Sequence, residues 1–503
     1  MLKKAKIFLI ALVVVLTLGA VDAFKFQLER LFKAYAYLTQ FSYEKPSKDL
    51  LYGAVEGMTA GLDPHSRFLD PVTLRTLRED QGGKFYGLGI SITSINGKIT
   101  VMQVLKGTPA EKAGLLVGDA IVKVDGKSIL GYTATEAVKV LRGPKGTKVK
   151  IEVEREGYSK PLEFIIERAE IPLNSVRYSF IFNDDIGYIA LNSFAIKSDE
   201  EIRTSLEKLK RQGMKYLILD LRSNGGGALK SAVEICDEFL FPPQVIVTTR
   251  GRTPESFAEY RAKKRGQFEY LPVAILVNHY SASASEIVAG ALQDHKRAII
   301  VGTKTFGKGL VQTLYPLSED TALALTTAKY YTPSGKCIQK PFSNWILYFW
   351  GINSPDYENS PGGITPDIRV KPQLLKELAA RMRGKGLFFR WANSFSRGKR
   401  KVSRDYLPLI RSSRPENIVI YKAIVKDFLE FARKNGIKYT TRELKESEPD
   451  IKFELKYELV NILWGLEEGV KVILRNDNTF HKAIEKRPLA EKLVREYLSR
   501  AGK

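Results

Sequence analysis

The sequence contains few of the residues that hold metals or disulfides. Only two cysteines, Cys236 and Cys337, and four histidines occur among its 503 residues. Two cysteines cannot build a disulfide framework, and no cysteine–histidine spacing matches a zinc site. The histidines are too widely scattered to indicate a metal cluster. We therefore expect the chain to bind no metal.

Long hydrophobic runs are also scarce, and the one that opens the chain is short. Ile7–Val21 is an apolar run preceded by three lysines and followed by small residues around Ala23. This order is typical of an export signal, whereas a membrane-spanning helix needs about 20 apolar residues. We expect residues 1–23 to direct the protein to the periplasm or cell envelope, as a cleaved signal or as an uncleaved anchor.

Acidic residues are too few to balance the basic ones, which gives a formal net charge of +23. Residues 371–503 hold 31 Lys and Arg against 17 Asp and Glu, and residues 381–404 hold nine basic residues and no acid. Such a stretch could meet anionic lipid or nucleic acid, and it could equally be a solvated face or linker. A membrane-surface contact stays open here, and we expect no nucleic acid as a partner.

The length is sufficient for about three domains of ordinary size. Residues 24–82 have apolar residues at helical spacing, interrupted by the turn-rich Gly61–Ser66. This segment is expected to pack on the body of the protein or on a second copy, as in a homodimer. Residues 371–503 are predicted to be mostly helical and carry no chemical motif.

Residues 83–170 have a different pattern. Two alternating strands flank an Asn96-Gly97 turn, which predicts a hairpin. The element Gly118-Asp-Ala-Ile-Val-Lys-Val-Asp-Gly126 follows, then a predicted helix and strand. Together these residues resemble a PDZ domain.

The PDZ resemblance implies a binding site for the carboxylate of a protein C-terminus. In that family a glycine-rich loop offers successive N–H groups to the carboxylate, and the peptide adds to the sheet edge as a strand. Here the loop would consist of Gly87, Leu88, Gly89 and Ile90. The structural alternative is a tight glycine turn with no ligand.

From residue 171 to 370, predicted strands and helices alternate, which indicates an α/β layer built from βαβ units. Sites in such sheets lie at the carboxyl ends of the strands. Two motifs fall at such ends: Gly225-Gly-Gly227, and the run Ser281-Ala-Ser-Ala-Ser-Glu286 ahead of a helix.

Ser283 has two interpretations. Ser283-Ala-Ser-Glu286 matches a capping box, in which Ser is the N-cap and Glu is residue N3. A serine at a strand-to-helix junction can also be a nucleophile, because the N–H groups at the helix start can hold an oxyanion.

A serine nucleophile needs a base, and a lysine is better placed than either nearby histidine. His295 falls at the far end of the predicted helix, about 18 Å along its axis, and no carboxylate pattern orients His279. Lys308 precedes a predicted strand on which Gln312 projects to the same face. A lysine base requires burial to lower its pKa by roughly three units from ~10.4, and the neutral Gln312 amide could orient the amine without raising that pKa.

A phosphate-binding loop is the rival interpretation of Lys308. Gly302-x-x-x-x-Gly307-Lys308 matches the start of that motif. Gly309 stands where the motif needs Ser or Thr, and a strand is predicted where the motif needs a helix. We therefore do not expect nucleotide binding.

Six segments in order resemble the carboxy-terminal processing peptidases, tail-specific serine proteases with a PDZ domain. They are Leu62–Ser66, the PDZ segment, Asp220–Gly227, Val277–Ile287, Thr305–Gln312 and Gly363–Asp367. The resemblance implies that Ser283 is the nucleophile, Lys308 the base and Gln312 its orienting residue. It also implies backbone oxyanion donors at Gly227 and Ala284, and it makes Arg142 a candidate for coupling the PDZ domain to catalysis.

The predicted fold is therefore a multidomain α/β chain, and the predicted function that of an exported serine endopeptidase without a cofactor. Its expected parts are a signal or anchor, a helical N-terminal segment, a PDZ domain, an α/β protease core and a basic helical extension (1–23, 24–82, 83–170, 171–370 and 371–503). The expected substrates are unfolded or flexible protein C-termini. The alternative is a PDZ-containing envelope adaptor with a silent protease-like body. An aromatic insert at 340–362 and the tail after 371 depart from the family plan.

Overall fold

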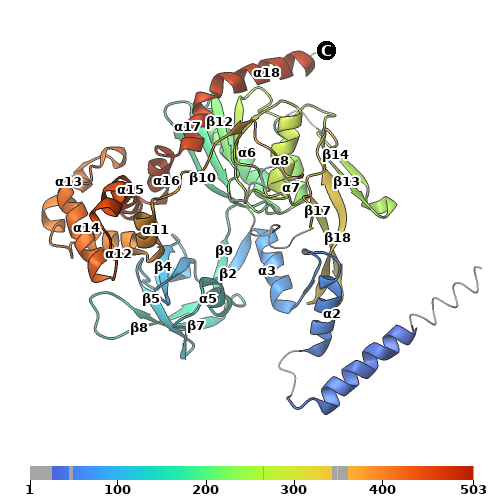
Figure 1. Ribbon diagram of the computed structural model, residues 1–503, viewed down its shortest axis with the longest axis horizontal. Coiled ribbons are helices and arrows are strands. Elements are labelled where there is room, and N and C mark those ends of the chain that lie inside the picture. The colour runs from blue at the N-terminus through green and yellow to red at the C-terminus, as the bar shows by residue number, and fades with distance from the viewer. Residues whose placement is uncertain (1–24, 45–48, 264–265, 343–347, 349–360, 502–503) are drawn as a thin grey trace, which may run out of the picture. The chain divides into compact units, whose positions relative to one another are not determined.

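The computed structural model describes residues 25–44, 49–263, 266–342, 348 and 361–501. The chain divides into two compact units (Figure 1). The first comprises Met1–Leu74 and Gln312–Thr326, and the second comprises Arg75–Val311 and Thr327–Lys503. The expected signal or anchor lies outside the described residues. No helix within the described ranges is long and apolar enough to cross a bilayer.

The first unit contains a helix over residues 25–41, then α2 (Leu50–Ala60) and β1 (Arg67–Leu69). The predicted break at Gly61–Ser66 is a turn, in which Asp63 Oδ1 accepts the N–H groups of His65 (2.8 Å) and Ser66 (2.9 Å). β1 pairs antiparallel with the start of β18 (Ala322–Tyr331). Helix 25–41 exposes apolar side chains around its circumference: Phe26, Leu28, Leu31, Phe32, Tyr35, Tyr37, Leu38 and Phe41.

The second unit begins with α3 (Pro71–Gly82), most of which it contains, and the residues that resemble a PDZ domain. Their sheet has the order β3 (Ile90–Ile95), β4 (Lys98–Val104), β5 (Ala120–Val124), β7 (Lys148–Glu154), β8 (Leu162–Glu167), and β6 (Lys127–Ser128) pairs with β5. Helices α4 (Pro109–Lys112) and α5 (Ala134–Leu141) complete this part, while β2 (Lys84–Gly87) pairs with β9 (Ala169–Pro172) at its ends.

The predicted Asn96-Gly97 hairpin is confirmed. It joins β3 and β4, and both turn residues have positive φ, +51° and +72°, as a two-residue hairpin turn requires. β3 has only β4 as a neighbour within this sheet, so its other edge is unpaired there. An unpaired edge next to the glycine loop is what addition of a peptide strand needs.

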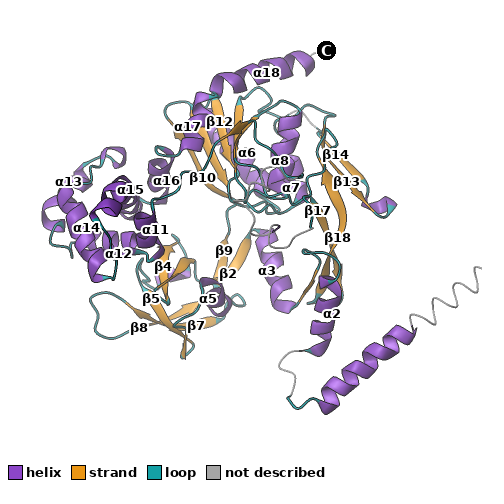
Figure 2. Cartoon of the chain, viewed as in Figure 1, coloured by secondary structure: helices purple, strands orange, loops and turns teal. Residues whose placement is uncertain are grey.

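The core of the second unit is a six-stranded sheet. Its order is β10 (Val176–Phe182), β11 (Ile186–Leu191), β12 (Tyr216–Asp220), β15 (Val273–Val277), β16 (Ile299–Gly302), β19 (Ile368–Arg369), and all pairs from β11 onward are parallel. β11, β12 and β15 are buried at every position, because helices cover both faces. The carboxyl ends of the parallel strands therefore meet at one edge (Figure 2).

Helices cover both faces of this sheet, and α18 (Arg487–Ala501) contributes apolar residues to the clusters on both. The crossover helices α6 (Ser198–Arg211), α7 (Leu229–Asp237) and α8 (Ala284–Asp294) share one apolar cluster with it. Residues of α16 (Leu466–Leu474), α17 (Asn478–Glu485) and α18 join the cluster on the other face. The end of the chain is thus part of the core, since Tyr216 Oη donates to Ala483 O at 2.7 Å.

A second sheet contains β13 (Val245–Gly251), β14 (Ala258–Arg261), β17 (Leu310–Pro316) and β18. The end of β18 pairs antiparallel with β13. The unit boundary falls within β17 and within β18, so both strands contribute residues to each unit.

The helical extension has its own core, around the fully buried Trp391. It consists of α11 (Glu377–Gly384), α12 (Leu387–Ser396), α13 (Ser403–Ser412), α14 (Lys422–Lys434) and α15 (Thr441–Trp464), followed by α16. The prediction that residues 371–503 are mostly helical agrees with these elements. α15 begins with a capping box formed by Thr440 and Glu443, and it accommodates Pro449.

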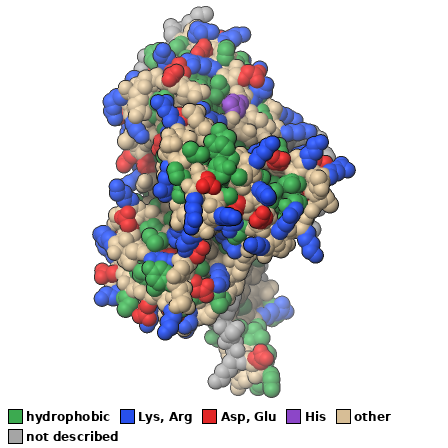
Figure 3. Space-filling view, turned by 90° about the vertical axis from the view of Figure 1, so that its left-hand side faces the viewer, with side chains coloured by type: hydrophobic (Ala, Val, Ile, Leu, Met, Phe, Trp, Pro, Cys, Tyr) green, Lys and Arg blue, Asp and Glu red, His purple; other side chains and the backbone are tan. Residues whose placement is uncertain are grey.

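The basic stretch 381–404 is largely paired within the protein. Arg381 bonds to Glu443, Arg400 to Asp427, and Arg397 donates to Val117 O at 2.7 Å. Figure 3 shows Lys and Arg side chains spread over the face it presents, with hydrophobic and acidic side chains between them. These contacts favour a solvated, internally paired face over a patch kept for an anionic partner. The predicted fold class, with a PDZ domain ahead of an α/β core and a helical extension, is confirmed.

Candidate active site

Ser283 lies between the end of β15 and the first residue of α8. It is the N-cap of α8, and its backbone has φ +56° and ψ −114°. A positive φ is strained for a residue with a Cβ and is found most often at functional positions. Ser283 and Glu286 also form a capping box. In it, the Ser283 N–H donates to Glu286 Oε2 at 2.9 Å. Both interpretations of the sequence thus apply to the same residue.

The other two serines of the motif bond to backbone carbonyls. Ser281 Oγ donates to Leu221 O at 2.7 Å, and Ser285 Oγ donates to Asn224 O at 2.9 Å. Both residues are fully buried. Their hydroxyls bind the turn at residues 278–285, called here the serine turn, to the loop that follows β12, which indicates a structural role for both serines.

Glycines in the loop after β12 allow that loop to approach Ser283. A Cβ on Gly226 would lie 2.7 Å from Ser283 Cβ and 2.9 Å from Ala284 N. Gly226 has φ +97° and Gly227 has φ +148°, values that favour glycine. Asn224, fully buried, shapes the loop by accepting the Gly226 N–H at 2.9 Å and donating to Leu191 O at 2.7 Å.

The N–H groups of Gly227 and Ala284 donate to no other group in the part of the chain that the structure describes. Ala284 is the first residue of α8, where the N–H groups lack intrahelical acceptors. Because Gly226 lacks a side chain, nothing covers the Ala284 N–H from that direction. Both donors keep the capacity that an oxyanion would use.

The Glu286 carboxylate joins the serine turn to the loop that contains Lys308. Its Oε2 accepts the N–H groups of Ser283 (2.9 Å) and Lys308 (2.8 Å), and its Oε1 accepts from Gly307 N and Thr305 Oγ1, both at 2.6 Å. Glu286 is completely buried, and this burial raises its pKa although the four hydrogen bonds favour the ionised form. One side chain therefore fixes the backbone at the candidate nucleophile and at the candidate base.

Sequence reasoning identified Glu286 only as a cap and did not identify Asn224 or Thr305. The serine motif and the loop motif both appear in the sequence, but the carboxylate that joins them acts across about twenty residues. Only the three-dimensional fold shows this link.

Lys308 is half-buried just before β17. The strand that follows confirms that this glycine–lysine loop lacks the helix of a phosphate-binding loop. Gln312 lies within β17, and its Nε2 donates to His65 O at 2.5 Å. The amide of Gln312 is thereby oriented by the Gly61–Ser66 turn, a contact that the sequence did not predict.

Neither histidine has the surroundings of a catalytic base. His295 is the C-cap of α8, at the opposite end of the helix from Ser283, and its Nε2 bonds to Val245 O at 2.7 Å. The ring of His279 packs at a tilt against Tyr280 with centroids 4.0 Å apart, and burial lowers the pKa of His279.

Within the insert at 340–362, residues 343–347 and 349–360 lie outside the described residues, and Tyr348 between them is described. Tyr348 is 2% exposed and packs edge-on against Phe306 in the Lys308 loop, with centroids 5.6 Å apart. Lys340 Nζ donates to Tyr348 O at 2.7 Å and lies 3.8 Å from the Phe306 ring centroid. Burial lowers the pKa of Lys340 to about 8.

The candidate tail-binding loop follows β2. Gly89 has φ +82°, and a Cβ there would lie 2.3 Å from Thr108 Cβ. The loop is anchored through its carbonyls, because Leu88 O and Gly89 O each accept a backbone N–H at 2.9 Å. These contacts use the carbonyl groups of the loop. They do not use its N–H groups, which are the groups that a carboxylate needs.

Arg142, at the C-terminal end of α5, reaches out of the PDZ segment. Its guanidinium lies 3.6 Å from Glu79 Oε2 in α3 and 4.2 Å from the Phe85 ring centroid. Arg142 thus connects α5, which lies beside β3, to α3, which precedes the PDZ segment.

Comparison with known proteins agrees with these features. Residues 185–370 match the model of peptidase family S41, and residues 100–155 match a PDZ domain. A carboxy-terminal-processing protease of Bartonella bacilliformis is 42% identical over 340 residues, 67% of this chain and 73% of that protein. The carboxy-terminal processing protease CtpA of Bacillus subtilis is 32% identical, over 72% of this chain and 78% of that protein.

Among solved structures, the photosystem II D1 C-terminal processing protease is 29% identical, with a TM-score of 0.39, and the match covers 68% of this chain and 86% of that one. The extent of the sequence matches to the bacterial proteases establishes the family. The chain belongs to peptidase family S41, as a carboxy-terminal processing protease with a PDZ domain.

Proposed function

We propose that the protein is an exported serine endopeptidase in which Ser283 is the nucleophile, Lys308 the general base and Gln312 the residue that orients the base. The supporting observation is the Glu286 carboxylate, which holds the backbone of Ser283 and of Lys308 on one buried group. Such fixed geometry is what a nucleophile and its base require.

In the proposed reaction, the Ser283 hydroxyl attacks the substrate carbonyl while its proton passes to the neutral Lys308 amine. The N–H groups of Gly227 and Ala284 stabilise the resulting oxyanion. The tetrahedral intermediate collapses to an acyl-enzyme, and the Lys308 ammonium gives its proton to the leaving amine. Lys308 then takes a proton from water, whose attack on the ester releases the acyl product and restores Ser283.

The PDZ domain is proposed to select substrates by their C-terminal tails. A tail would add to the open edge of β3, with its carboxylate at the N–H groups of Gly87–Ile90. Arg142 is well situated to transmit tail binding, because it contacts Glu79 and Phe85 outside α5. No cofactor enters this scheme.

The N-terminal helix is proposed to form a homodimer with the same helix of a second copy. Its apolar side chains are exposed, among them Phe32 at 67% and Phe41 at 70%, and helices with such surfaces are stabilised by partners. Export to the periplasm or envelope remains part of the proposal on the sequence pattern of residues 1–23.

The deciding experiment is cleavage of an unfolded protein with an apolar C-terminus by wild type, Ser283→Ala and Lys308→Ala. We expect both variants to lose cleavage by at least about 1,000-fold while a tail peptide still binds, and a serine-reactive fluorophosphonate should label wild type alone. Full activity of Ser283→Ala would refute the assignment. If wild type binds tails but cleaves nothing and is not labelled, the adaptor function is the correct one.

A further inference from the structure

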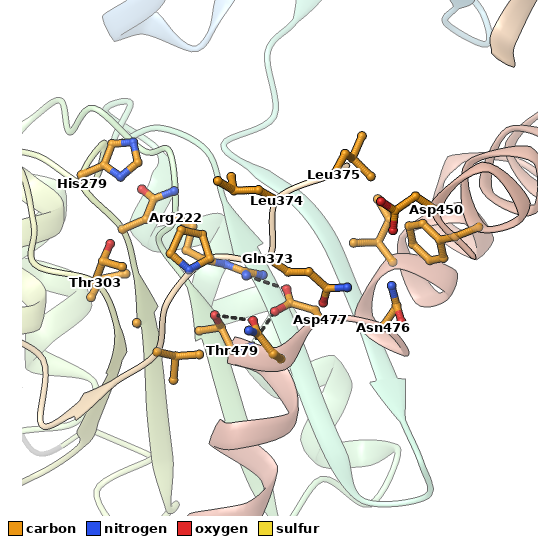
Figure 4. A pocket seen from close by; sticks show the side chains of 18 of the residues that line it. Arg222, His279, Thr303, Gln373, Leu374, Leu375, Asp450, Asn476, Asp477 and Thr479 are labelled. Atoms are coloured by element: carbon orange, nitrogen blue, oxygen red, sulfur yellow. Dashed lines mark hydrogen bonds and ion pairs between the residues drawn. The ribbon is translucent and has the colours of Figure 1, made fainter. Parts of the chain in front are cut away.

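A pocket of about 270 Å³ lies beside the serine turn, where the core meets the helical extension (Figure 4). Arg222, His279 and Thr303, which follow β12, β15 and β16, line one side, and Asp450 and Asn476 line the other. All of its lining residues belong to the second unit. The carboxyl ends of parallel strands are where such sheets bind ligands.

The arginine in this pocket is already neutralised. Arg222 donates from Nε and Nη2 to Asp220 and from Nη1 to Asp477 Oδ2, at 2.5–3.0 Å. Asp477 Oδ1 in turn caps α17 by accepting the N–H groups of Thr479 and Phe480. The charge of Arg222 is therefore balanced by two carboxylates, which makes it a weak site for an anion.

Two polar atoms of the lining lack a partner in the described part of the chain. They are Thr303 Oγ1 and Glu454 Oε2, both buried. Glu454 is 2% exposed, and its other oxygen, Oε1, lies 3.5 Å from Arg383 Nη1. A buried carboxylate oxygen without a donor is costly, burial raises the pKa of Glu454, and a cationic donor in the pocket would relieve the cost.

Acidic groups outnumber basic ones on this side of the pocket. Asp450 and Glu454 lie four residues apart on α15 and so share one helix face. The cation near them, Arg383, has a side chain that is 58% exposed. The ligand that fits this charge balance is a cation.

Apolar side chains and the position of the pocket identify the kind of cation. Phe453 and Ile473 line the pocket and could pack against an aliphatic stem. Asn278 also lines the pocket and is the first residue of the turn that leads to Ser283. Its N–H donates to Ser281 Oγ at 3.0 Å. Leu374 of the connecting segment is 79% exposed, so this wall reaches solvent.

We infer that this pocket receives a lysine or arginine side chain of the substrate, with its charged group on Glu454 Oε2, and so makes the enzyme prefer chains with a basic residue near the cleaved bond. The inference rests on the proposed function, since it assumes that peptide substrates lie at Ser283. The alternative that this inference excludes is a pocket filled by water alone, in which the Glu454 carboxyl is protonated.

The test uses pairs of peptides that end in the same apolar tail and differ only by lysine or norleucine at one position, moved in turn along both sides of the cleaved bond. Wild type should cleave the lysine peptide with a kcat/KM about tenfold higher at one position, as one charge-assisted hydrogen bond would give. Glu454→Gln should bring this lysine-to-norleucine ratio close to one. Glu458→Gln, one turn away and outside the lining, is the matched control and should keep the ratio.

The substitution Arg383→Gln alters an exposed side chain and should change the lysine-to-norleucine ratio in the opposite direction. Removing the competing cation should raise the ratio roughly threefold. An active wild type without a lysine preference at any position, a ratio unchanged in Glu454→Gln, or a ratio that Arg383→Gln fails to raise would each overturn the inference and leave the proposed function standing. If Ser283→Ala cleaves as well as wild type, the proposed function itself fails.

Discussion

The serine turn together with the loop after β12, and the proposed tail-binding loop of the PDZ segment, both contain glycines that a side chain could not replace without a clash, but different groups hold them. Around Ser283, buried side chains bind the backbone: Asn224, Ser281, Ser285 and Glu286 each accept or donate hydrogen bonds there. Around Gly89, the anchoring bonds at 2.9 Å are from backbone to backbone, and one side chain, Thr108, donates to Gly89 O at 3.4 Å. The first region suits chemistry that needs fixed atoms, and the second suits ligands of varied side chain.

The strongest test of this contrast is Gly226→Ala. The added Cβ would meet Ser283 Cβ and Ala284 N at under 3 Å on a backbone with φ +97°. We expect kcat/KM on an unfolded protein to fall by about 100-fold or more, because displaced oxyanion donors cost this much.

Gly225→Ala is the matched control, since a Cβ there meets nothing within 4 Å. Its activity should stay within about twofold of wild type. Equal losses in both variants would mean that the loop needs glycine for flexibility rather than for close approach to Ser283.

The same substitution in the other region, Gly89→Ala, should impair recognition and leave the serine turn intact. The Cβ would collide with Thr108 at φ +82°, so we expect tail-peptide affinity to fall about tenfold. Titration of a fluorescent tail peptide measures this, and the rate of fluorophosphonate labelling at Ser283 should not change. Loss of labelling together with binding would show that the two regions are not separable.

A smaller effect is expected from the buried charge beside the Lys308 loop. Burial lowers the pKa of Lys340 from its ordinary 10.5 to about 8, so between pH 8 and 10.5 the unfolded chain binds more protons than the folded one. Stability from this group therefore rises with pH across that window and is lowest below it. Lys340→Met should remove this rise, about 3 kcal/mol at most, in chemical denaturation at pH 7.5 and 10. A wild-type rise that survives in the variant would assign it to another group.

The smallest effect is expected at His295. Its ring bonds to Val245 O at the far end of α8, so His295→Ala should cost about 1 kcal/mol of stability and leave kcat/KM near wild type. Loss of activity at unchanged melting temperature would return a histidine to the mechanism.

Local patterns in the sequence were sufficient for much of the fold. The Asn96-Gly97 hairpin, the buried strands β12 and β15, and the start of α8 at the serine motif all follow from turn chemistry and periodicity. β13 and β18 were not predicted, because β18 pairs with a strand about 80 residues away and with β1 about 250 residues away.

The candidate site divides in the same way. Ser283 and Lys308 could be chosen from their motifs, since each is defined by its immediate neighbours. Glu286 could be identified only as a cap, because its bonds to Gly307 and Lys308 depend on how two loops meet. The pocket beside Glu454 could not be predicted at all, because it is formed by strand ends and a helix that lies far along the chain, such as Thr303 and Asp450.

The way Glu286 binds Ser283 has a practical consequence. The carboxylate accepts the backbone N–H of residue 283 and not the hydroxyl, so an alanine there would keep the same connection to the Lys308 loop. Ser283→Ala would then be an intact receptor that has lost only its reactive oxygen. Immobilised in that form, the protein would serve as a substrate trap, from which the natural tails could be eluted and sequenced.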